Sequence, residues 1–284
     1  LMAADPGHPD IVERHVYLDA DLSRPECIDT GRFRVGIHSA RRPGKSGPNE
    51  DGALCLGLSD GSLVIAVADG MGGHAAGEQA AATALHAIEA AVRDALAQGR
   101  GLRAGVVDGI DAAHAAVQAL QGDGGTTLVA ATIEGQEVRT IHVGDAAAVL
   151  MTGQGRPVHT TASHSPVGYA LEAGLLDEDE AIVHVDRHLV SNAVGLGPMK
   201  IELGPVLAWR PRHTLVLGSD GLFDNLRLDE ITTLARKGPV RDVTGRLADL
   251  ARVRMGSSTA GLPSKPDDLT FLVIRNDGRR ARRS

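Results

Sequence analysis

Carboxylate side chains stand at the ends of several apolar segments of the chain. The clearest case is Asp69, which closes the run Leu63–Ala68, because an apolar, β-branched run that stops at Asp-Gly is typical of a buried strand. Comparable positions beside predicted strands are held by Glu50, Asp51, Asp145, Asp220, Asp267 and Asp268. One aspartate at a strand end usually makes only a turn. Several in one sheet system would repel one another and would be costly to remove from water.

A bound divalent cation would resolve this repulsion. Mg²⁺ and Mn²⁺ prefer carboxylate and carbonyl oxygens, and the sequence has no cluster of Cys and His residues at the spacing of a zinc site. Several carboxylates together can hold two ions about 3.5–4 Å apart and activate a bridging water as hydroxide for in-line attack on phosphorus. The spacing therefore favours an oxygen-ligated metal site.

The glycines after Asp69 permit a different interpretation. Residues Gly70–Ala75 fit G-x-G-x-x-A, the fingerprint of a dinucleotide-binding turn. Such a site needs parallel βαβ units and an acidic residue about 20 positions further on, at the end of a second strand. Glu89 lies at that distance but inside a predicted helix, and hairpin-connected strands follow. A nucleotide-binding oxidoreductase is therefore disfavoured.

Hairpin-connected strands and two groups of helices must position the carboxylates. Hydrophobic periodicity predicts strands over residues 12–18, 32–38, 53–58, 63–68, 127–133, 138–143, 146–151, 157–161, 201–209, 215–217 and 269–274. It predicts helices over residues 75–97, 102–120, 166–173, 228–236 and 241–255. Residues 127–161 have the pattern of a meander, whose strands are antiparallel. Because strands outnumber helices, the expected class is α+β.

Composition and charge exclude several classes of protein. The formal net charge is −7, which disfavours nucleic acid as the main partner, and no segment approaches the roughly 18 apolar residues of a membrane span. The first residues are polar and unlike a signal peptide, so a cytoplasmic protein is expected. We expect an N-terminal arm over residues 1–30, one main domain over residues 31–276 and a basic tail over residues 277–284.

As an ordered set, these motifs resemble the metal-dependent protein serine/threonine phosphatases of the type 2C family, in their bacterial form. The segments that carry the resemblance are Asn49–Asp51, Val67–His74, Gly125–Leu128, Val143–Asp145, Leu217–Asp224 and Pro266–Thr270. Each is weak alone, but the ordered set is specific and spans about residues 32–274. The resemblance implies a four-layer α-β-β-α sandwich, in which helices flank two mostly antiparallel sheets and metal ions lie at one end.

The resemblance also implies a role for each acidic position. Asp69 would bridge two Mn²⁺ or Mg²⁺ ions and, with Asp220, would be catalytic. The implied metal-site residues are Asp69, Gly70 (through its carbonyl), Asp220, Asp267, Glu50, Asp51 and Asp145, of which the last would help to form a third, weaker site. The substrate would be phosphoserine or phosphothreonine on a protein, in opposition to a serine/threonine kinase. We expect a monomer that engages neither nucleic acid nor membrane.

The sequence departs from the family pattern where the substrate would be bound. The arginine that many members carry before the acidic pair falls near Ser46, so Lys45, Arg42 or Arg41 would have to bind the phosphate. Met71 stands where some members have a general-acid histidine, which leaves His74 or a metal-bound water for that role.

The flap expected over residues 163–197 also differs from the family pattern, with Ser163 and Asn192 at positions where other residues are common. Two alternatives therefore stay open. One is a weak or inactive pseudophosphatase that regulates by binding phosphoproteins, and the other is a phosphatase for small phosphate esters.

Overall fold

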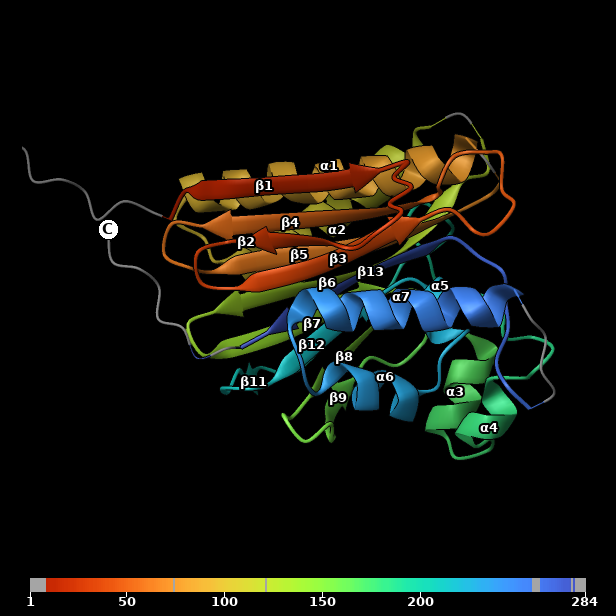
Figure 1. Ribbon diagram of the computed structural model, residues 1–284. Helices are drawn as coiled ribbons and strands as arrows, with labels where there is room; N and C mark the ends of the chain where they lie inside the picture. Colours follow the sequence, from red (N-terminus) through yellow and green to blue (C-terminus); the bar gives the residue numbers. More distant parts are fainter. Residues whose placement is uncertain (1–8, 74, 121, 257–260, 277, 279–284) are drawn as a thin grey trace, which may run out of the picture.

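Two β-sheets pack face to face in the computed structural model, with helices on both outer faces (Figure 1). The structure describes residues 9–73, 75–120, 122–256, 261–276 and 278. This arrangement confirms the predicted α+β class and the four-layer α-β-β-α sandwich. No helix within these residues is long and apolar enough to cross a membrane.

Each sheet is antiparallel throughout the described residues. The first has seven strands in the order β1-β4-β5-β6-β7-β10, with β11 also beside β7. Their bounds are Ile11–Leu18 (β1), Asp51–Leu58 (β4), Leu63–Met71 (β5), Gly125–Glu134 (β6), Glu137–Val143 (β7), Glu202–Leu203 (β10) and Leu207–Ala208 (β11). Because β5 pairs antiparallel with both neighbours, the turn after Asp69 does not belong to a parallel βαβ unit, and the dinucleotide-binding interpretation is wrong.

The second sheet has six strands among the described residues, in the order β2-β3-β13-β12-β8-β9. Their bounds are Glu26–Asp29 (β2), Arg34–Ala40 (β3), Leu269–Arg275 (β13), Thr214–Gly218 (β12), Ala147–Met151 (β8) and Pro157–Thr160 (β9). The order brings β12 and β13, which are distant in sequence from β3 and β8, into the middle of the sheet.

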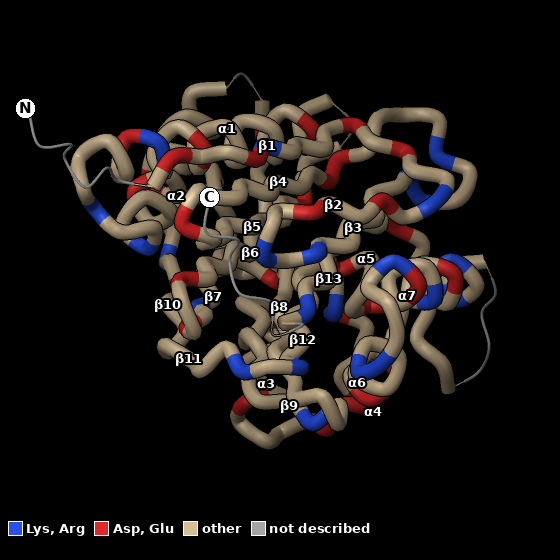
Figure 2. Tube along the Cα trace, turned by 60° about the vertical axis from the view of Figure 1, so that its left-hand side comes forward, with Lys and Arg blue, Asp and Glu red and all other residues tan. Residues whose placement is uncertain are grey.

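Two pairs of longer helices cover the outer faces (Figure 1). The helices α1 (Ala75–Ala97) and α2 (Leu102–Gln118) pack on the first sheet, and α6 (Leu228–Ala235) and α7 (Val240–Gly256) pack on the second. Basic and acidic positions are interspersed along α7, as expected for a helix with one solvent-facing side (Figure 2). Three short helices are α3 (Pro166–Glu172), α4 (Glu178–Ala181) and α5 (Asp220–Phe223), of which only α3 matches a helix range predicted above.

The central strand β5 is apolar on both faces because both faces are buried. Val64, Ala66 and Ala68 belong to the core under α1 and α2. Ile65 and Val67 belong to a second core between the two sheets. A strand that is covered on both sides has a continuous apolar sequence instead of an alternating one, which is why the run before Asp69 could be recognised.

Two strands lie within the segment predicted as an N-terminal arm. β1 is the edge strand of the first sheet beside β4, and β2 is the edge strand of the second sheet beside β3. The described part of this segment is therefore integrated into the sandwich, because edge pairing needs only a few apolar positions in an otherwise polar stretch. The division into an arm, a main domain and a tail stays a prediction.

The chain changes sheet in the middle of the predicted meander. β7 pairs with β6 in the first sheet, but β8 pairs with β12 and β9 in the second. The antiparallel prediction is confirmed, whereas the continuous meander is wrong. The crossing falls at Gly144-Asp145, so Asp145 lies where the two sheets meet. The predicted strand over residues 201–209 is likewise divided into β10 and β11.

Candidate metal centre

Two carboxylates lie side by side on β4 and β5. Asp51 is directly opposite Asp69 in the antiparallel register. Side chains alternate along a strand, so Asp51 shares a face with Cys55, and Asp69 shares a face with Val67. Both of those residues pack between the sheets. The two carboxylates therefore point into the inter-sheet space at one end of the sandwich, where directly opposed like charges are destabilising.

β5 continues past Asp69 to Met71, which differs from the expectation that the strand ends at the aspartate. Asp69 also pairs with Thr127 on β6. The hydroxyl of Thr126, the preceding residue of β6, donates to the Asp69 carbonyl at 2.8 Å. Within the described part of the chain, no hydrogen bond is found to the Asp69 carboxylate. The backbone of this aspartate is thus fixed on both sides while its side chain keeps its lone pairs for another partner.

The second sheet supplies carboxylates to the same end of the sandwich. Asp220 begins α5 directly after β12, and Asp267 lies just before β13. The Ser219 hydroxyl donates to Asp51 Oδ2 at 2.7 Å, which connects the two sheets beside the cluster. The cluster has six members: Asp51, Asp69, Asp145, Asp220, Asp224 and Asp267.

The electrostatics of this cluster favour a cation. Burial, reinforced by the neighbouring carboxylates, raises the pKa of both Asp51 and Asp69 well above the ordinary value. Burial and the Asp220 charge raise the pKa of Asp145 to about 8. The same two causes raise the pKa of Asp224 and of Asp267 to about 6. A bound cation would stabilise the ionised forms of these buried, mutually repelling carboxylates. Because the carboxylates offer only oxygen as a ligand atom, hard divalent ions such as Mg²⁺ and Mn²⁺ fit the site.

Gly70 holds the turn beside the cluster because no side chain fits there. A Cβ on Gly70 would lie 2.1 Å from the Gly77 carbonyl oxygen and 2.7 Å from that of Glu50. The Gly70 amide donates to the Glu50 carbonyl at 3.1 Å. The close approach brings the start of α1, the end of β5 and the loop before β4 together, so Glu50 lies next to the predicted metal ligands.

Asp268 fastens the loop over residues 41–50 to β13. Its Oδ1 accepts from the Arg42 amide at 2.9 Å, and its Oδ2 accepts from the Glu50 amide at 2.8 Å. The Lys45 ammonium lies 2.5 Å from Asp268 Oδ2 and 3.3 Å from Glu50 Oε2, with its side chain 5% exposed. Lys45 is therefore held by carboxylates that neighbour the cluster.

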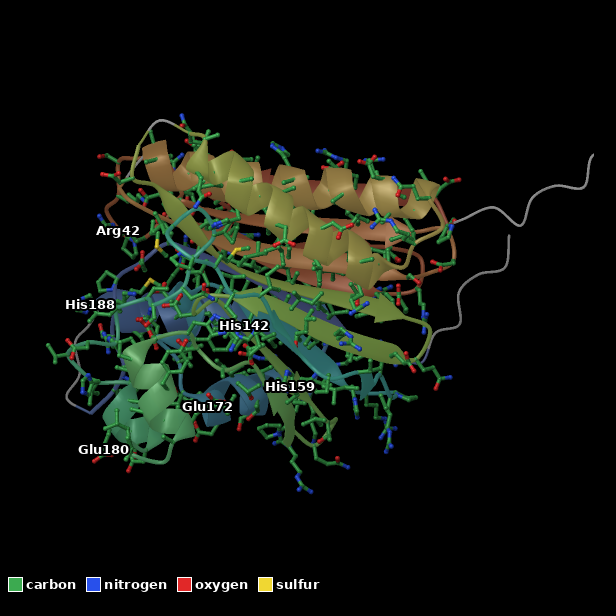
Figure 3. All side chains as sticks on the ribbon, turned by 180° about the vertical axis from the view of Figure 1, so that it is seen from behind. Arg42, His142, His159, Glu172, Glu180 and His188 are labelled. Atoms are coloured by element: carbon green, nitrogen blue, oxygen red, sulfur yellow. The ribbon has the colours of Figure 1, made fainter. Side chains whose placement is uncertain are left out.

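The three cations predicted to bind phosphate have different surroundings. The ammonium of Lys45 is engaged as just described, and the Arg41 guanidinium pairs with Asp19 at 3.0 Å. Arg42 is exposed, and its guanidinium has no hydrogen-bond or ion-pair partner among the described residues. It lies at the same end of the molecule as the flap residues Glu172 and Glu180 (Figure 3). All three roles stay predictions, and the candidate general acid His74 lies outside the described residues.

Two functional candidates were missed in the sequence. Lys265 makes ion pairs with Asp220, with Asp224 at 3.1 Å and with Asp267 at 3.4 Å. Asp224 was noticed only as part of a motif, one helical turn after Asp220. The available signals were this spacing, which places two residues on one face of a helix, and a lysine two positions before Asp267.

The flap segment (residues 163–197) is anchored next to Asp145. The Gly144 amide donates to His164 Nδ1 at 3.1 Å, and the His164 amide donates to the Gly144 carbonyl at 2.9 Å. Near the other end of the flap segment, the Ser191 amide donates to the His164 carbonyl, and Val194 exchanges two backbone bonds with Thr126. The start of the flap segment is therefore tied to the loop that carries Asp145, and its end is tied to His164 and to β6.

His164 is also part of a small group with His142 and Glu202, in which both histidines are buried and the Glu202 side chain is 40% exposed. Its ring stacks on His142 with centroids 4.5 Å apart, and its Nε2 lies 3.1 Å from Glu202 Oε2. Ligating atoms of these three residues lie within 4.8 Å of one another. His142 Nε2 is bonded to the Ala162 carbonyl at 2.7 Å, so most of these atoms already have partners. We therefore assign this group a structural role.

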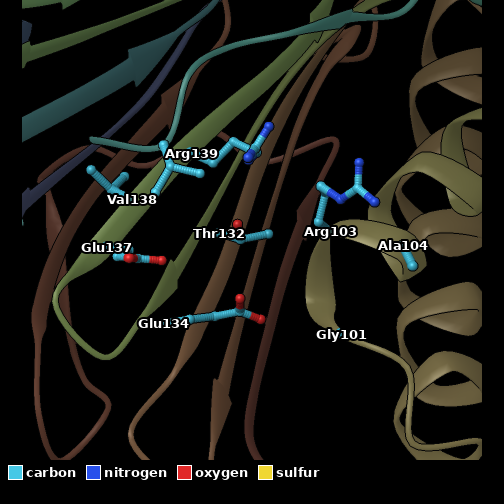
Figure 4. Close-up of a pocket in the computed structure, with 9 residues that line it drawn as sticks. Gly101, Arg103, Ala104, Thr132, Glu134, Glu137, Val138 and Arg139 are labelled. Carbon is cyan, nitrogen blue, oxygen red and sulfur yellow. The ribbon is translucent and has the colours of Figure 1, made fainter. Parts of the chain in front are cut away.

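A pocket of about 470 Å³ opens between the flap segment and the carboxylate cluster. Its lining includes Asp145, Asp220 and Asp224 together with apolar residues such as Leu171 and Phe223. Another pocket, of about 320 Å³, lies at the opposite end of β6, and its lining includes Arg103, Arg139, Glu134 and Glu137 (Figure 4). It contains no residue of the predicted site.

These features define a class of protein in which two antiparallel sheets present a buried carboxylate cluster at one end. The protein phosphatase 2C family matches residues 40–253, and the chain belongs to this family. The predicted enzyme class, a protein-serine/threonine phosphatase, is thereby confirmed. A putative 2C-type phosphatase of Streptococcus pyogenes is 27% identical over 242 residues, which cover 82% of this chain and 94% of that protein.

The serine/threonine phosphatase PstP of Mycobacterium tuberculosis is similar in both sequence and structure. It is 30% identical over 223 residues, which are 75% of this chain but only 40% of PstP. Its crystal structure superposes with a TM-score of 0.68 at 28% identity and covers 86% of this chain and 98% of that one. A structure of the PstP catalytic domain with two manganese ions gives a TM-score of 0.64 at 27% identity.

Proposed function

We propose that this chain hydrolyses phosphoserine and phosphothreonine on proteins, using two Mn²⁺ or Mg²⁺ ions held by the carboxylate cluster. The observation that carries the proposal is the pair Asp51 and Asp69, opposed on neighbouring strands and facing Asp220 and Asp267 of the other sheet. The two manganese ions of the PstP catalytic domain support the same chemistry.

The residues have distinct roles in this proposal. Asp69 would help to hold both ions, Gly70 would offer its carbonyl to one of them, and Asp220 and Asp267 would hold the other. Glu50, in the loop before β4, and Asp51, at the start of β4, would orient this arrangement, and Asp145 with Asp220 would hold a third, weaker ion. When bound, the ions supply Lewis-acid activation of water and of the phosphoryl group.

Arg42 is the residue that we assign to the phosphate group of the substrate. Its guanidinium is exposed and unengaged, whereas Lys45 and Arg41 are held by carboxylates. A guanidinium can form two parallel hydrogen bonds to a phosphate, which fixes the orientation of the phosphorus atom. The neighbouring pocket would receive side chains that flank the phosphorylated residue. We further propose that the chain acts as a cytoplasmic monomer that opposes a serine/threonine kinase.

One observation favours the alternative, a catalytically weak protein that regulates by binding phosphoproteins. Lys45, which is the candidate nearest in sequence to the position of the missing family arginine, is paired with Asp268 and is unable to reach a phosphate without breaking that pair. The two proposals differ in turnover, since a regulator of this kind would bind metal ions and phosphopeptide without releasing phosphate.

The deciding experiment measures phosphate release from a phosphothreonine peptide and from a small aryl phosphate, with chelator, Mg²⁺ or Mn²⁺. The variants are wild type, Asp69→Asn and the matched control Asp111→Asn on the exposed face of α2. Metal-dependent turnover of the peptide that only Asp69→Asn abolishes supports the phosphatase. Folded protein that binds Mn²⁺ without turnover supports the regulator, and preference for the small ester supports that substrate class. Turnover that resists both chelator and Asp69→Asn overturns the metal-dependent mechanism.

A further inference from the structure

Lys265 brings a positive charge into the carboxylate cluster. Its ammonium is paired with Asp220, lies 3.1 Å from Asp224 Oδ2 and lies 3.4 Å from Asp267 Oδ2, with the side chain 21% exposed. We propose that Lys265 is a built-in cation that competes with one divalent ion for these carboxylates and so weakens the binding of that ion. This inference rests on the proposed function, because Asp220 and Asp267 are the residues assigned there to one of the two ions.

The position of Lys265 is fixed by the fold. The Lys265 amide donates to Asn225 Oδ1 at 2.8 Å, and Asn225 Nδ2 donates to the Lys265 carbonyl at 2.8 Å. Asn225 is fully buried, and its Nδ2 also donates to the Gly221 carbonyl in α5. The backbone of Lys265 is thereby attached to α5, which begins at Asp220 and is followed directly by Asp224, so its ammonium stays within reach of both.

The competition follows from the oxygen atoms that Lys265 contacts. Oδ2 of Asp220, Oδ2 of Asp224 and Oδ2 of Asp267 all face the ammonium. A divalent ion that binds Asp220 and Asp267 must share these carboxylates with the lysine or displace it, and two cations at one carboxylate repel each other. Without a divalent ion, the ammonium partly neutralises the same group of charges. Lys265 therefore has opposite effects on metal affinity and on the stability of the metal-free protein.

The test compares wild type with Lys265→Met and with Lys237→Met, a control that removes an exposed lysine at the end of α6. All three are stripped with chelator and then titrated with Mn²⁺, with binding followed by calorimetry and by electron paramagnetic resonance of free Mn²⁺. Lys265→Met should bind the Mn²⁺ ion assigned to Asp220 and Asp267 at least about tenfold more tightly, a change that corresponds to about 1.4 kcal/mol. Its metal-free form should melt at a lower temperature than wild type, and Lys237→Met should match wild type in both.

A second variant covers the case in which Lys265→Met does not fold. Lys265→Gln removes the charge but keeps a donor for Asp220 and Asp224, and it should also bind Mn²⁺ more tightly than wild type. Equal or weaker Mn²⁺ binding by a folded Lys265 variant, with wild type still active, overturns the inference and leaves the proposed function intact. Failure of every variant, wild type included, to bind Mn²⁺ overturns both, and the phosphopeptide assay above distinguishes the two results.

Discussion

Replacing Asp69 with asparagine should stabilise this protein when divalent cations are absent, although it removes a predicted metal ligand. Directly opposed residues of an antiparallel pair have Cβ atoms about 4.5–5.5 Å apart, and Asp69 has Asp51 as such a partner. Two unit charges about 5 Å apart at an effective dielectric constant of about 20 repel each other by about 3 kcal/mol. The substitution breaks no hydrogen bond of the Asp69 carboxylate within the described residues. For a chain of this size, the gain corresponds to about 6 °C in melting temperature.

The assay is thermal unfolding in chelator at about pH 8 and about pH 5, followed by the same measurement with Mn²⁺. Burial and the surrounding carboxylates raise the pKa of Asp69, so its protonated fraction grows as the pH falls, and the advantage of Asp69→Asn should be smaller at the lower pH. Mn²⁺ should stabilise wild type more than the variant, since a ligand that binds only the folded state stabilises it. Asp111→Asn should behave as wild type. A metal-free Asp69→Asn protein that melts below wild type at about pH 8 would refute the reasoning.

Three further predictions follow from the same contacts. Arg42→Ala should lower kcat/KM for a phosphopeptide by at least about tenfold, because a hydrogen bond to a charged group contributes roughly 1.5–3 kcal/mol. Unchanged kcat/KM in steady-state kinetics would show that Arg42 does not bind the phosphate. The metal-free wild type should lose stability as the pH rises from about 5 to 8. The reason is that three carboxyl groups bind protons more tightly in the folded than in the unfolded chain: Asp145, with a pKa of about 8, and Asp224 and Asp267, with a pKa of about 6. A melting temperature that stays constant across this range in chelator would contradict this prediction. Gly144→Ala should lower the free energy of unfolding, measured with denaturant, by about 1–3 kcal/mol and should weaken Mn²⁺ binding. The reason is that Gly144 has φ +98° and a Cβ there would lie 2.6 Å from Thr127 Cγ2. A variant as stable as wild type would show that the crossing loop adapts.

The fold class and the acidic positions could be predicted because their signals are local. The run before Asp69 is apolar on both faces of β5, so its sequence identifies a central strand without any knowledge of its neighbours. The register of β4 and β5 follows from a short hairpin, which is enough to place Asp51 opposite Asp69. Helices such as α1 were predicted with their observed bounds for the same reason.

The remaining features depend on contacts between distant segments. Lys265 reaches Asp220 from 45 positions away in the chain, and Lys45 reaches Asp268 from 223 positions away. Residue type alone suggested phosphate binding for Lys45, because a lysine in a glycine-rich loop gives no sign of a buried carboxylate partner. The crossing at Gly144-Asp145 was hidden in the same way, since β8 is apolar throughout and β7 is largely buried, so neither sequence shows which sheet the strand joins.

The anchoring of the flap segment has a consequence for how this protein can diverge. Both of its ends meet at His164, whose amide and ring bond to Gly144 and whose carbonyl accepts from the Ser191 amide. Val194 is hydrogen-bonded to Thr126 through the backbone. The intervening residues form a closed loop whose length adds little to the entropy of closing it. Insertions, deletions or exchanges inside that loop would leave Asp145 and the opposed pair on β4 and β5 in place. The flap segment can therefore change in sequence and length independently of the carboxylate cluster, which would alter the partners that reach the site without altering the site itself.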